Sequence, residues 1–153
     1  MSETCQVRGA VEADALAISR VIVEALRTSN SQDYSPAVIE RVERSFSPDA
    51  VLGLMARRQV VVAQVAGQVV GTASLDGDVV RTVFVAPGQQ GLGIGRALMQ
   101  RVEALAGAAG VHTLRVPSSL TAQAFYARLG YAVVREVVEG EERTIVMARE
   151  VGG

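Results

Sequence analysis

The sequence predicts a mixed α/β (α+β) fold, with one mostly antiparallel sheet of about six to seven strands and helices on both faces. Two observations support this prediction. Apolar residues recur at helical spacing in the first third of the chain, and β-branched runs bounded by turn residues follow. The chain has 153 residues, of which 49% are hydrophobic. At about 100–200 residues per domain, we expect a single domain over residues 1–153.

The first third of the chain is expected to be mostly helical. Its longest helix is predicted at 12–28, where an apolar stripe at helical spacing comprises Ile18, Val21, Ile22, Ala25 and Leu26. The segments expected here are a strand at 6–10, the helix at 12–28, a polar loop at 29–35, and helices at 36–45 and 48–56.

The middle of the chain, residues 59–85, changes to strand-like spacing. Asp76 and Gly77 form a dipeptide that is typical of a tight hairpin turn. The strands expected around the turns are 59–65, 68–75 and 78–85, which would pair as an antiparallel meander.

The last third alternates between helical and strand patterns. A helix is expected up to about residue 107, and a later one at 119–129 with Ser118 or Ser119 as its N-cap. The strands expected around them are 111–116, 131–138 and 143–148. The strand, helix and strand of residues 78–116 predict a right-handed crossover between two parallel strands.

Composition excludes several classes of protein. The net charge is −1, so no basic excess is available for binding nucleic acid. All 15 basic residues are Arg, which excludes a P-loop lysine and Schiff-base chemistry. One Cys and one His cannot assemble a zinc site, and we expect no metal. The chain contains neither a signal-peptide pattern nor an apolar run of about 18 residues, so we expect a cytoplasmic protein without a membrane partner.

A glycine-rich segment between a predicted strand and a predicted helix is the sharpest local feature. Gly91, Gly93 and Gly95 lie where the helix begins. Backbone N–H groups at a helix N-terminus have no intrahelical partner, and glycines let a phosphate approach them closely. A turn that uses glycine for its positive φ is the alternative. A dinucleotide-binding fingerprint would need glycine where Arg96 or Leu98 stands, which disfavours that interpretation.

Two motifs together resemble the GNAT superfamily of N-acetyltransferases. The first is Gln90-x-x-Gly93-x-Gly95, preceded by Val83-Phe84-Val85-Ala86-Pro87. The second is Ala122-x-x-Phe125-Tyr126-x-x-x-Gly130-Tyr131, which follows at the family's usual distance. The expected order of helices and strands is also similar to the family's, so the resemblance covers essentially the whole chain.

The resemblance implies acetyl-CoA as co-substrate. It implies a pyrophosphate on the backbone N–H groups of 90–96, and a pantetheine beside the strand that ends at Val85, where two parallel strands part after about Phe84. The N–H near Val85 would face the thioester oxygen. Tyr126 would be the general acid that protonates the leaving thiolate. The implied cofactor-binding residues are Val83, Phe84, Val85, Gln90, Gly91, Leu92, Gly93, Ile94, Gly95, Arg96, Ser119 and Tyr126.

The sequence departs from the family pattern at two places. Ser119 stands where the family often has Asn, and Val79 stands where many relatives carry a Glu as general base. Asp78 is adjacent, but neighbouring strand residues point to opposite faces, so the sequence names no base. The candidates for binding the acceptor are polar residues of the loop after the first helix, with acidic residues at the hairpin: Asn30, Asp33, Tyr34, Asp76 and Asp78.

The implied function is transfer of an acetyl group from acetyl-CoA to a primary amine of a small molecule or peptide, by direct attack in a ternary complex. Alternatives are a non-catalytic acyl-CoA-binding regulatory module, transfer of a longer acyl group or to a non-amine acceptor, and a dinucleotide-binding protein. The last strands could pair across a homodimer. The acceptor is open among small metabolites, polyamines, antibiotics, peptide N-termini and lysine.

Overall fold

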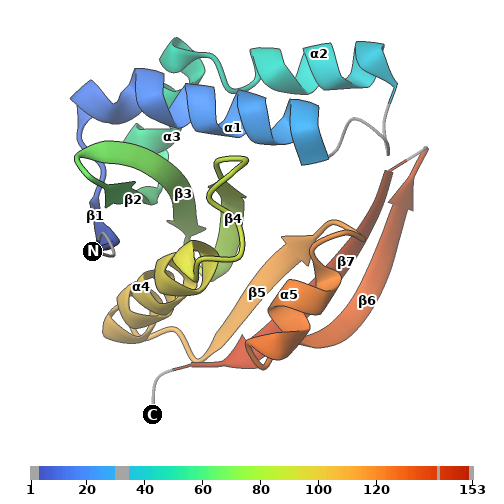
Figure 1. Ribbon diagram of the computed structural model, residues 1–153. Helices are drawn as coiled ribbons and strands as arrows, with labels where there is room; N and C mark the ends of the chain where they lie inside the picture. The colour runs from blue at the N-terminus through green and yellow to red at the C-terminus, as the bar shows by residue number, and fades with distance from the viewer. Residues whose placement is uncertain (1–3, 30–34, 141, 152–153) are drawn as a thin grey trace.

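A computed structural model describes residues 4–29, 35–140 and 142–151. Within these ranges, seven strands form one sheet in the order β1-β2-β3-β4-β5-β7-β6 (Figure 1). Only β4 and β5 pair in parallel, which confirms the mixed, mostly antiparallel sheet. The elements in chain order are β1 Gln6–Gly9, η1 Glu12–Asp14, α1 Ala15–Ser29, α2 Pro36–Arg44, α3 Pro48–Arg57, β2 Gln59–Val65, β3 Gln68–Asp76, β4 Val79–Val85, α4 Ile94–Ala108, β5 Thr113–Ser118, α5 Gln123–Arg128, β6 Ala132–Glu139 and β7 Glu142–Glu150.

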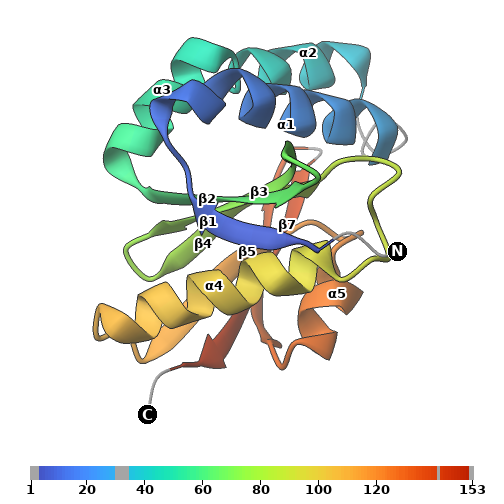
Figure 2. The same ribbon diagram turned by 60° about the vertical axis from the view of Figure 1, so that its left-hand side comes forward.

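Helices cover both faces of the sheet, as the sequence predicts. Figure 2 shows α1, α2 and α3 on one face and α4 and α5 on the other. The apolar stripe of α1 packs with Val51 and Val62 to form one core, while α4 forms the other core with β2 to β5 and β7. No helix in the described part of the chain is both long and apolar enough to cross a membrane.

Two predicted helices begin later than expected. The helix predicted at 12–28 begins with the 3-10 turn η1, and α1 proper starts at Ala15. The Asp14 carboxylate fixes this turn, because it accepts hydrogen bonds from the Val11 N–H at 2.8 Å and from Arg8 at 2.8 and 3.0 Å. The helix predicted at 119–129 begins at Gln123. Ser119 Oγ still accepts from the Ala122 N–H at 3.2 Å, but it caps a turn that leads into α5 rather than α5 itself.

The parallel strands β4 and β5 part earlier than expected. Their pairing is confined to Val79 and Arg115, so the separation expected after about Phe84 begins several residues sooner. The cause is a β-bulge: Thr72 pairs with Phe84 and Ser74 pairs with Arg81, so that two residues of β4 oppose one of β3. Bulges bend a strand and increase its twist. This bend turns β4 away from β5.

The edge strand β6 is exposed along most of its length. Val133, Val134 and Val138 have exposed fractions of 53%, 57% and 61%. Unpaired edge strands with apolar side chains can pair with another chain. Pairing of the last strands across a homodimer stays a prediction.

Candidate active site

A cavity of about 730 Å³ opens where β4 and β5 separate. Residues of both strands line it, together with the loop before α4, the first turn of α4, and α5 with the turn that precedes it. Ala25 and Phe46 line it from the α1 side of the sheet. The cavity therefore lies at the one place where the sheet's backbone ladder is interrupted between parallel strands.

The cavity brings together all of the cofactor-binding residues that the resemblance implies, except Leu92, which is 68% exposed and does not line it. Further residues line the cavity that sequence reasoning did not name as binding residues, although two of them, Ala122 and Phe125, belong to the second motif. The lining residues on β5 could have been found from the predicted parallel pairing of β4 and β5, because that pairing places the ends of the two strands together. The missed residues are Ala25, Phe46, Val80, Thr82, Gln89, Val116, Pro117, Ser118, Thr121, Ala122, Phe125 and Arg128.

The start of α4 has the geometry of an anion site. Gly93 is the N-cap of α4 at φ 80°, and a Cβ built on it meets no atom within 4 Å. The first hydrogen bond of the helix runs from the Ala97 N–H to the Gly93 carbonyl at 3.0 Å. The N–H groups of Ile94, Gly95 and Arg96 thus have no partner within the helix and carry the positive end of its dipole.

Gly95 has a different role from Gly93. A Cβ at Gly95 would lie 3.0 Å from the ring of Phe125 and 3.8 Å from Val85. The missing side chain therefore allows α4 to approach α5 and the end of β4 closely. This contact places the anion-binding end of α4 next to the helix that carries Tyr126.

Tyr126 lies on α5 and is only 5% exposed. Its ring makes edge-to-face contacts with Phe125, at a centroid distance of 5.1 Å, and with Tyr131, at 5.9 Å. Burial raises the pKa of the Tyr126 phenol well above its ordinary value near 10, so the hydroxyl is protonated at neutral pH. Among the described residues the hydroxyl has no hydrogen-bond partner, and its ring lines the cavity. It can donate one hydrogen bond, or its proton, to a group bound there.

A polar cluster of Glu103 and Arg149 fixes Tyr131, whose ring contacts that of Tyr126. The Tyr131 hydroxyl donates to Glu103 of α4 at 2.7 Å, and Arg149 of β7 donates to both oxygens of the same carboxylate at 3.2 Å. The Tyr131 N–H also bonds the Tyr126 carbonyl at 3.1 Å. The pKa of Tyr131 is raised mainly by burial and, to a smaller extent, by the hydrogen bond to Glu103. The cluster thus connects α4, α5 and β7 beside the cavity.

The predicted acceptor residues are not assembled by the described part of the chain. Asn30, Asp33 and Tyr34 lie outside the described residues. Asp78 does not line the cavity and lies 3.9 Å from Arg115, while Asp76 accepts a hydrogen bond from Arg81 at 3.1 Å. The lining, as far as the structure describes it, contains no Asp, Glu or His. Its charged side chains are Arg96 and Arg128.

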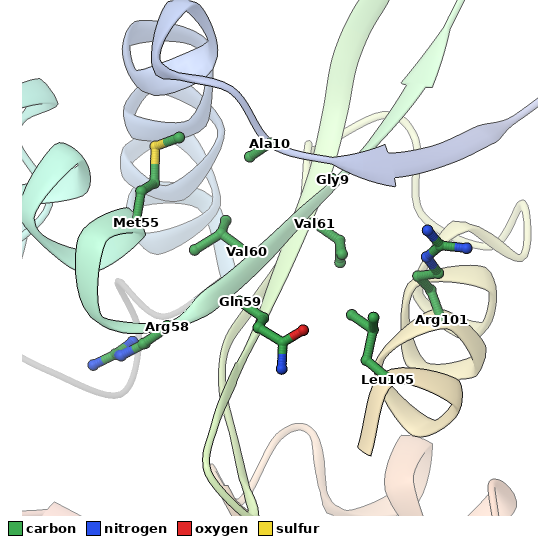
Figure 3. A pocket seen from close by; sticks show the side chains of 9 residues that line it. All are labelled: Gly9, Ala10, Met55, Arg58, Gln59, Val60, Val61, Arg101 and Leu105. Carbon is green, nitrogen blue, oxygen red and sulfur yellow. The ribbon is translucent and has the colours of Figure 1, made fainter. Parts of the chain in front are cut away.

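A second cavity of about 280 Å³ lies at the start of β2, between the end of α3 and α4 (Figure 3). Val60 and Val61 both line it, although successive strand residues point to opposite faces, so it wraps around the edge of the sheet. Arg58 and Arg101 lie at its opposite ends and do not converge (Figure 3). Binding sites hold a few converging polar groups, which this cavity lacks.

The described lining of the cavity beside α4 contains no cluster of metal ligands. Within the described ranges there is no group of three or more His, Cys, Asp or Glu side chains that could hold a metal ion. The groups that the cavity does offer are free backbone N–H donors, two arginines and a protonated phenol. These groups suit an anionic ligand with a polarised carbonyl or a leaving group that needs a proton.

Comparison with known proteins identifies the family. The model of the acetyltransferase (GNAT) domain matches residues 30–149, and the chain therefore belongs to the GNAT acetyltransferase family. No curated protein sequence matches it. A GCN5-related N-acetyltransferase from Rhodopseudomonas palustris is similar in structure, with TM-score 0.88 and 25% identity over 99% of both chains.

Two similar structures contain the expected ligand. PaiA N-acetyltransferase from Thermoplasma acidophilum, in complex with coenzyme A, has TM-score 0.84 and 18% identity over 96% of this chain and 99% of that one. YncA from Salmonella typhimurium, with acetyl-CoA, has TM-score 0.72 and 24% identity over 95% and 93%. At these identities the two structures show the shared fold.

Proposed function

We propose that this protein is an N-acetyltransferase that transfers the acetyl group of acetyl-CoA to a primary amine by direct attack within a ternary complex. One observation carries the proposal: a single cavity joins the free N–H groups of the α4 terminus, the separated edges of β4 and β5, and the protonated hydroxyl of Tyr126. Membership of the GNAT family supports it.

The residues present fit acetyl-CoA. The N–H groups of Ile94, Gly95 and Arg96, with the Arg96 and Arg128 side chains, would hold the phosphates, because charge-assisted hydrogen bonds to phosphate are short and strong. The open space at Gly93 leaves room for the phosphates to approach. Beyond Val79, the edge of β4 that faces β5 has no strand pairing among the described residues and would bind the pantetheine amides. When bound, acetyl-CoA supplies an activated acetyl group on a thiol leaving group.

The protein's own groups would then stabilise the negative charge that develops on the carbonyl oxygen and on the leaving sulfur. A backbone N–H near Val85 would donate to the carbonyl oxygen, which gains negative charge as the amine attacks. Tyr126 would give its proton to the sulfur as the carbon–sulfur bond breaks with its electron pair on sulfur. The amine nitrogen forms the new bond to the acetyl carbon, and its surplus proton leaves to solvent, from which Tyr126 regains one. Ser119 would contribute its hydroxyl at the cofactor side.

The test combines binding and turnover. Acetyl-CoA should raise the melting temperature, because a ligand that binds only the folded state stabilises it, whereas NAD and ATP should do much less. Release of free thiol in the presence of an amine panel then measures transfer. Binding of acetyl-CoA without turnover of any amine would favour a regulatory module, and a larger rate with longer acyl-CoA would replace acetyl by that acyl group.

A further inference from the structure

The cavity has two chemically different ends, on opposite faces of the sheet. At one end, Val83 and Val85 pack with the core that contains α4. At the other, Phe84 packs with Phe46 in the core beneath α1. Because successive residues of β4 point to opposite faces, the cavity passes through the gap beside this strand. We call the end lined by Ala25, Phe46 and Phe84 the apolar arm.

The apolar arm is preorganised by contacts outside the cavity. The rings of Phe46 and Phe84 meet edge to face, with centroids 6.3 Å apart. The Phe46 carbonyl accepts a hydrogen bond from the buried Ser19 hydroxyl at 2.6 Å, which ties the α2–α3 connection to α1. Ala25, which is 4% exposed, completes the wall with a small side chain. The arm therefore offers two fixed aromatic rings and room beside them.

The described residues of the apolar arm carry no charge. The charged side chains of the described lining, Arg96 and Arg128, lie on α4 and α5 at the other end of the cavity, and Arg58 donates to the lining residue Thr82 at 3.2 Å. The carboxylates nearest in sequence, Asp76 and Asp78, are already paired with Arg81 and Arg115. An ammonium group in the arm would lose its hydration and gain no carboxylate from the described lining.

We propose that the acceptor is a primary amine on an aromatic or other bulky apolar group. This inference rests on the proposed acetyltransferase function and names the class of its substrate. The apolar group occupies the arm between Phe46 and Phe84, where aromatic contacts add to the burial of its surface. The amino group then enters the cavity uncharged, since an apolar arm favours the neutral form.

The inference differs from the expectation raised by the acidic residues of the sequence. Carboxylates at the acceptor site would select polyamines and other cations. The structure places Asp76 and Asp78 outside the cavity and the rings of Phe46 and Phe84 at its apolar arm, while Asp33 lies outside the described residues. The selectivity between an aromatic amine and a diamine therefore separates the two interpretations.

The experiment compares 2-phenylethylamine with 1,4-diaminobutane as acceptors of the acetyl group from acetyl-CoA. Thiol release measures the rate in the wild-type protein and in the variants Phe46→Ala and Phe46→Leu. We expect kcat/KM to be at least about tenfold higher for 2-phenylethylamine. Phe46→Ala should lower that value about tenfold, a clearly larger loss than the same variant shows with 1,4-diaminobutane. Phe46→Leu keeps most of the apolar volume, folds without a large cavity, and should give a smaller loss in the same direction.

The outcomes separate the inference from the function on which it rests. An equal or higher kcat/KM for 1,4-diaminobutane, or an equal loss for both amines in the Phe46 variants, overturns the apolar acceptor and leaves the acetyltransferase standing. If neither amine supports thiol release but another amine of the panel does, the apolar acceptor is overturned and the acetyltransferase stands. If no amine of the panel supports thiol release although acetyl-CoA binds, both are overturned. The KM for acetyl-CoA, which the Phe46 variants should leave unchanged, distinguishes a lost acceptor contact from a damaged fold.

Discussion

Replacing Gly93 by Asp or by Asn tests the anion site with a matched pair. Gly93 caps α4 with a left-handed backbone, φ 80° and ψ 8°, and its Cβ would point into open space. Asp and Asn have the same size, both tolerate this conformation better than other side chains, and both are favourable N-caps. The two variants should therefore fold with similar stability and differ only in one negative charge.

The charge should weaken acetyl-CoA binding by an amount that can be bracketed. Two unit charges about 4 Å apart interact by about 1 kcal/mol in bulk water and about 4 kcal/mol at the effective dielectric near a protein surface. Gly93 lies at an open cavity wall, between these limits. Since about 1.4 kcal/mol corresponds to a tenfold change, Gly93→Asp should bind roughly tenfold to a hundredfold more weakly than Gly93→Asn.

Calorimetric titration of acetyl-CoA into the three proteins measures this difference, with thermal unfolding as the control for folding. Raising the salt concentration should narrow the gap between the Asp and Asn variants, because salt screens charges but does not change the volume of a side chain. Equal affinities for Gly93→Asp and Gly93→Asn at low salt would refute a phosphate at this position. Wild-type affinity in both would show that the glycine loop is only a turn.

Three further predictions concern Tyr126, Asp14 and Tyr131. Tyr126→Phe should lower kcat by a factor of roughly 10²–10⁴ with little loss of acetyl-CoA affinity. Steady-state kinetics and a binding titration measure the two effects. If chemistry is rate-limiting and kcat falls by less than about threefold, Tyr126 has no part in the mechanism. Asp14→Asn should lower the free energy of unfolding in urea by about 1.5–3 kcal/mol, because it weakens the charged hydrogen bonds to Arg8. The Arg8 side chain lowers the pKa of Asp14, so this stabilisation is present above the unfolded pKa of about 3.9 and is lost as pH falls through the lower pKa of the folded state. A stability gap between wild type and Asp14→Asn that does not narrow as the pH is lowered from about 5 would contradict the assignment. The pKa values of Tyr126 and Tyr131 are raised in the folded protein, so the free energy of unfolding of the wild type should fall as pH rises above about 10. Tyr131→Phe removes one of these groups and should make that fall less steep. Identical slopes of unfolding free energy against pH in the two proteins would show that Tyr131 ionises as freely in the folded protein as in the unfolded chain.

The fold was predictable where its signals are local. The Asp76 and Gly77 turn, the glycines before α4 and the apolar stripe of α1 each depend on residues a few positions apart, and the structure has the corresponding hairpin, helix terminus and buried face. The position of the cavity followed from the same motifs, because a glycine loop between a strand and a helix places free N–H groups at the strand's end.

The features that the sequence did not predict depend on contacts between distant segments. The early separation of β4 and β5 requires the bulge opposite Ala73, which is held partly by Arg58 from the end of α3. Phe46 lines the cavity from the α2–α3 connection, which the Ser19 hydroxyl ties to α1 and which packs against the distant Phe84. The sequence also did not show that Asp76 and Asp78 lie beside Arg81 and Arg115 and outside the described cavity lining, because these contacts depend on the register of paired strands.

The bulge on β4 connects the two ends of the cavity. Thr82 has φ 57°, an unfavourable conformation for a β-branched residue, and such strain persists only where surrounding contacts hold it. The Arg58 hydrogen bond to Thr82 Oγ1 is one such contact. After the bulge, strand alternation directs Phe84 to the apolar arm and Val83 and Val85 to the α4 side. The β4 edge beyond Val79 has no described strand pairing to β5. A regular strand would restore pairing with β5 and close the gap through the sheet. The strained backbone at Thr82 therefore lies at the bulge beside the gap between β4 and β5, where the proposed function places acetyl-CoA and its acceptor.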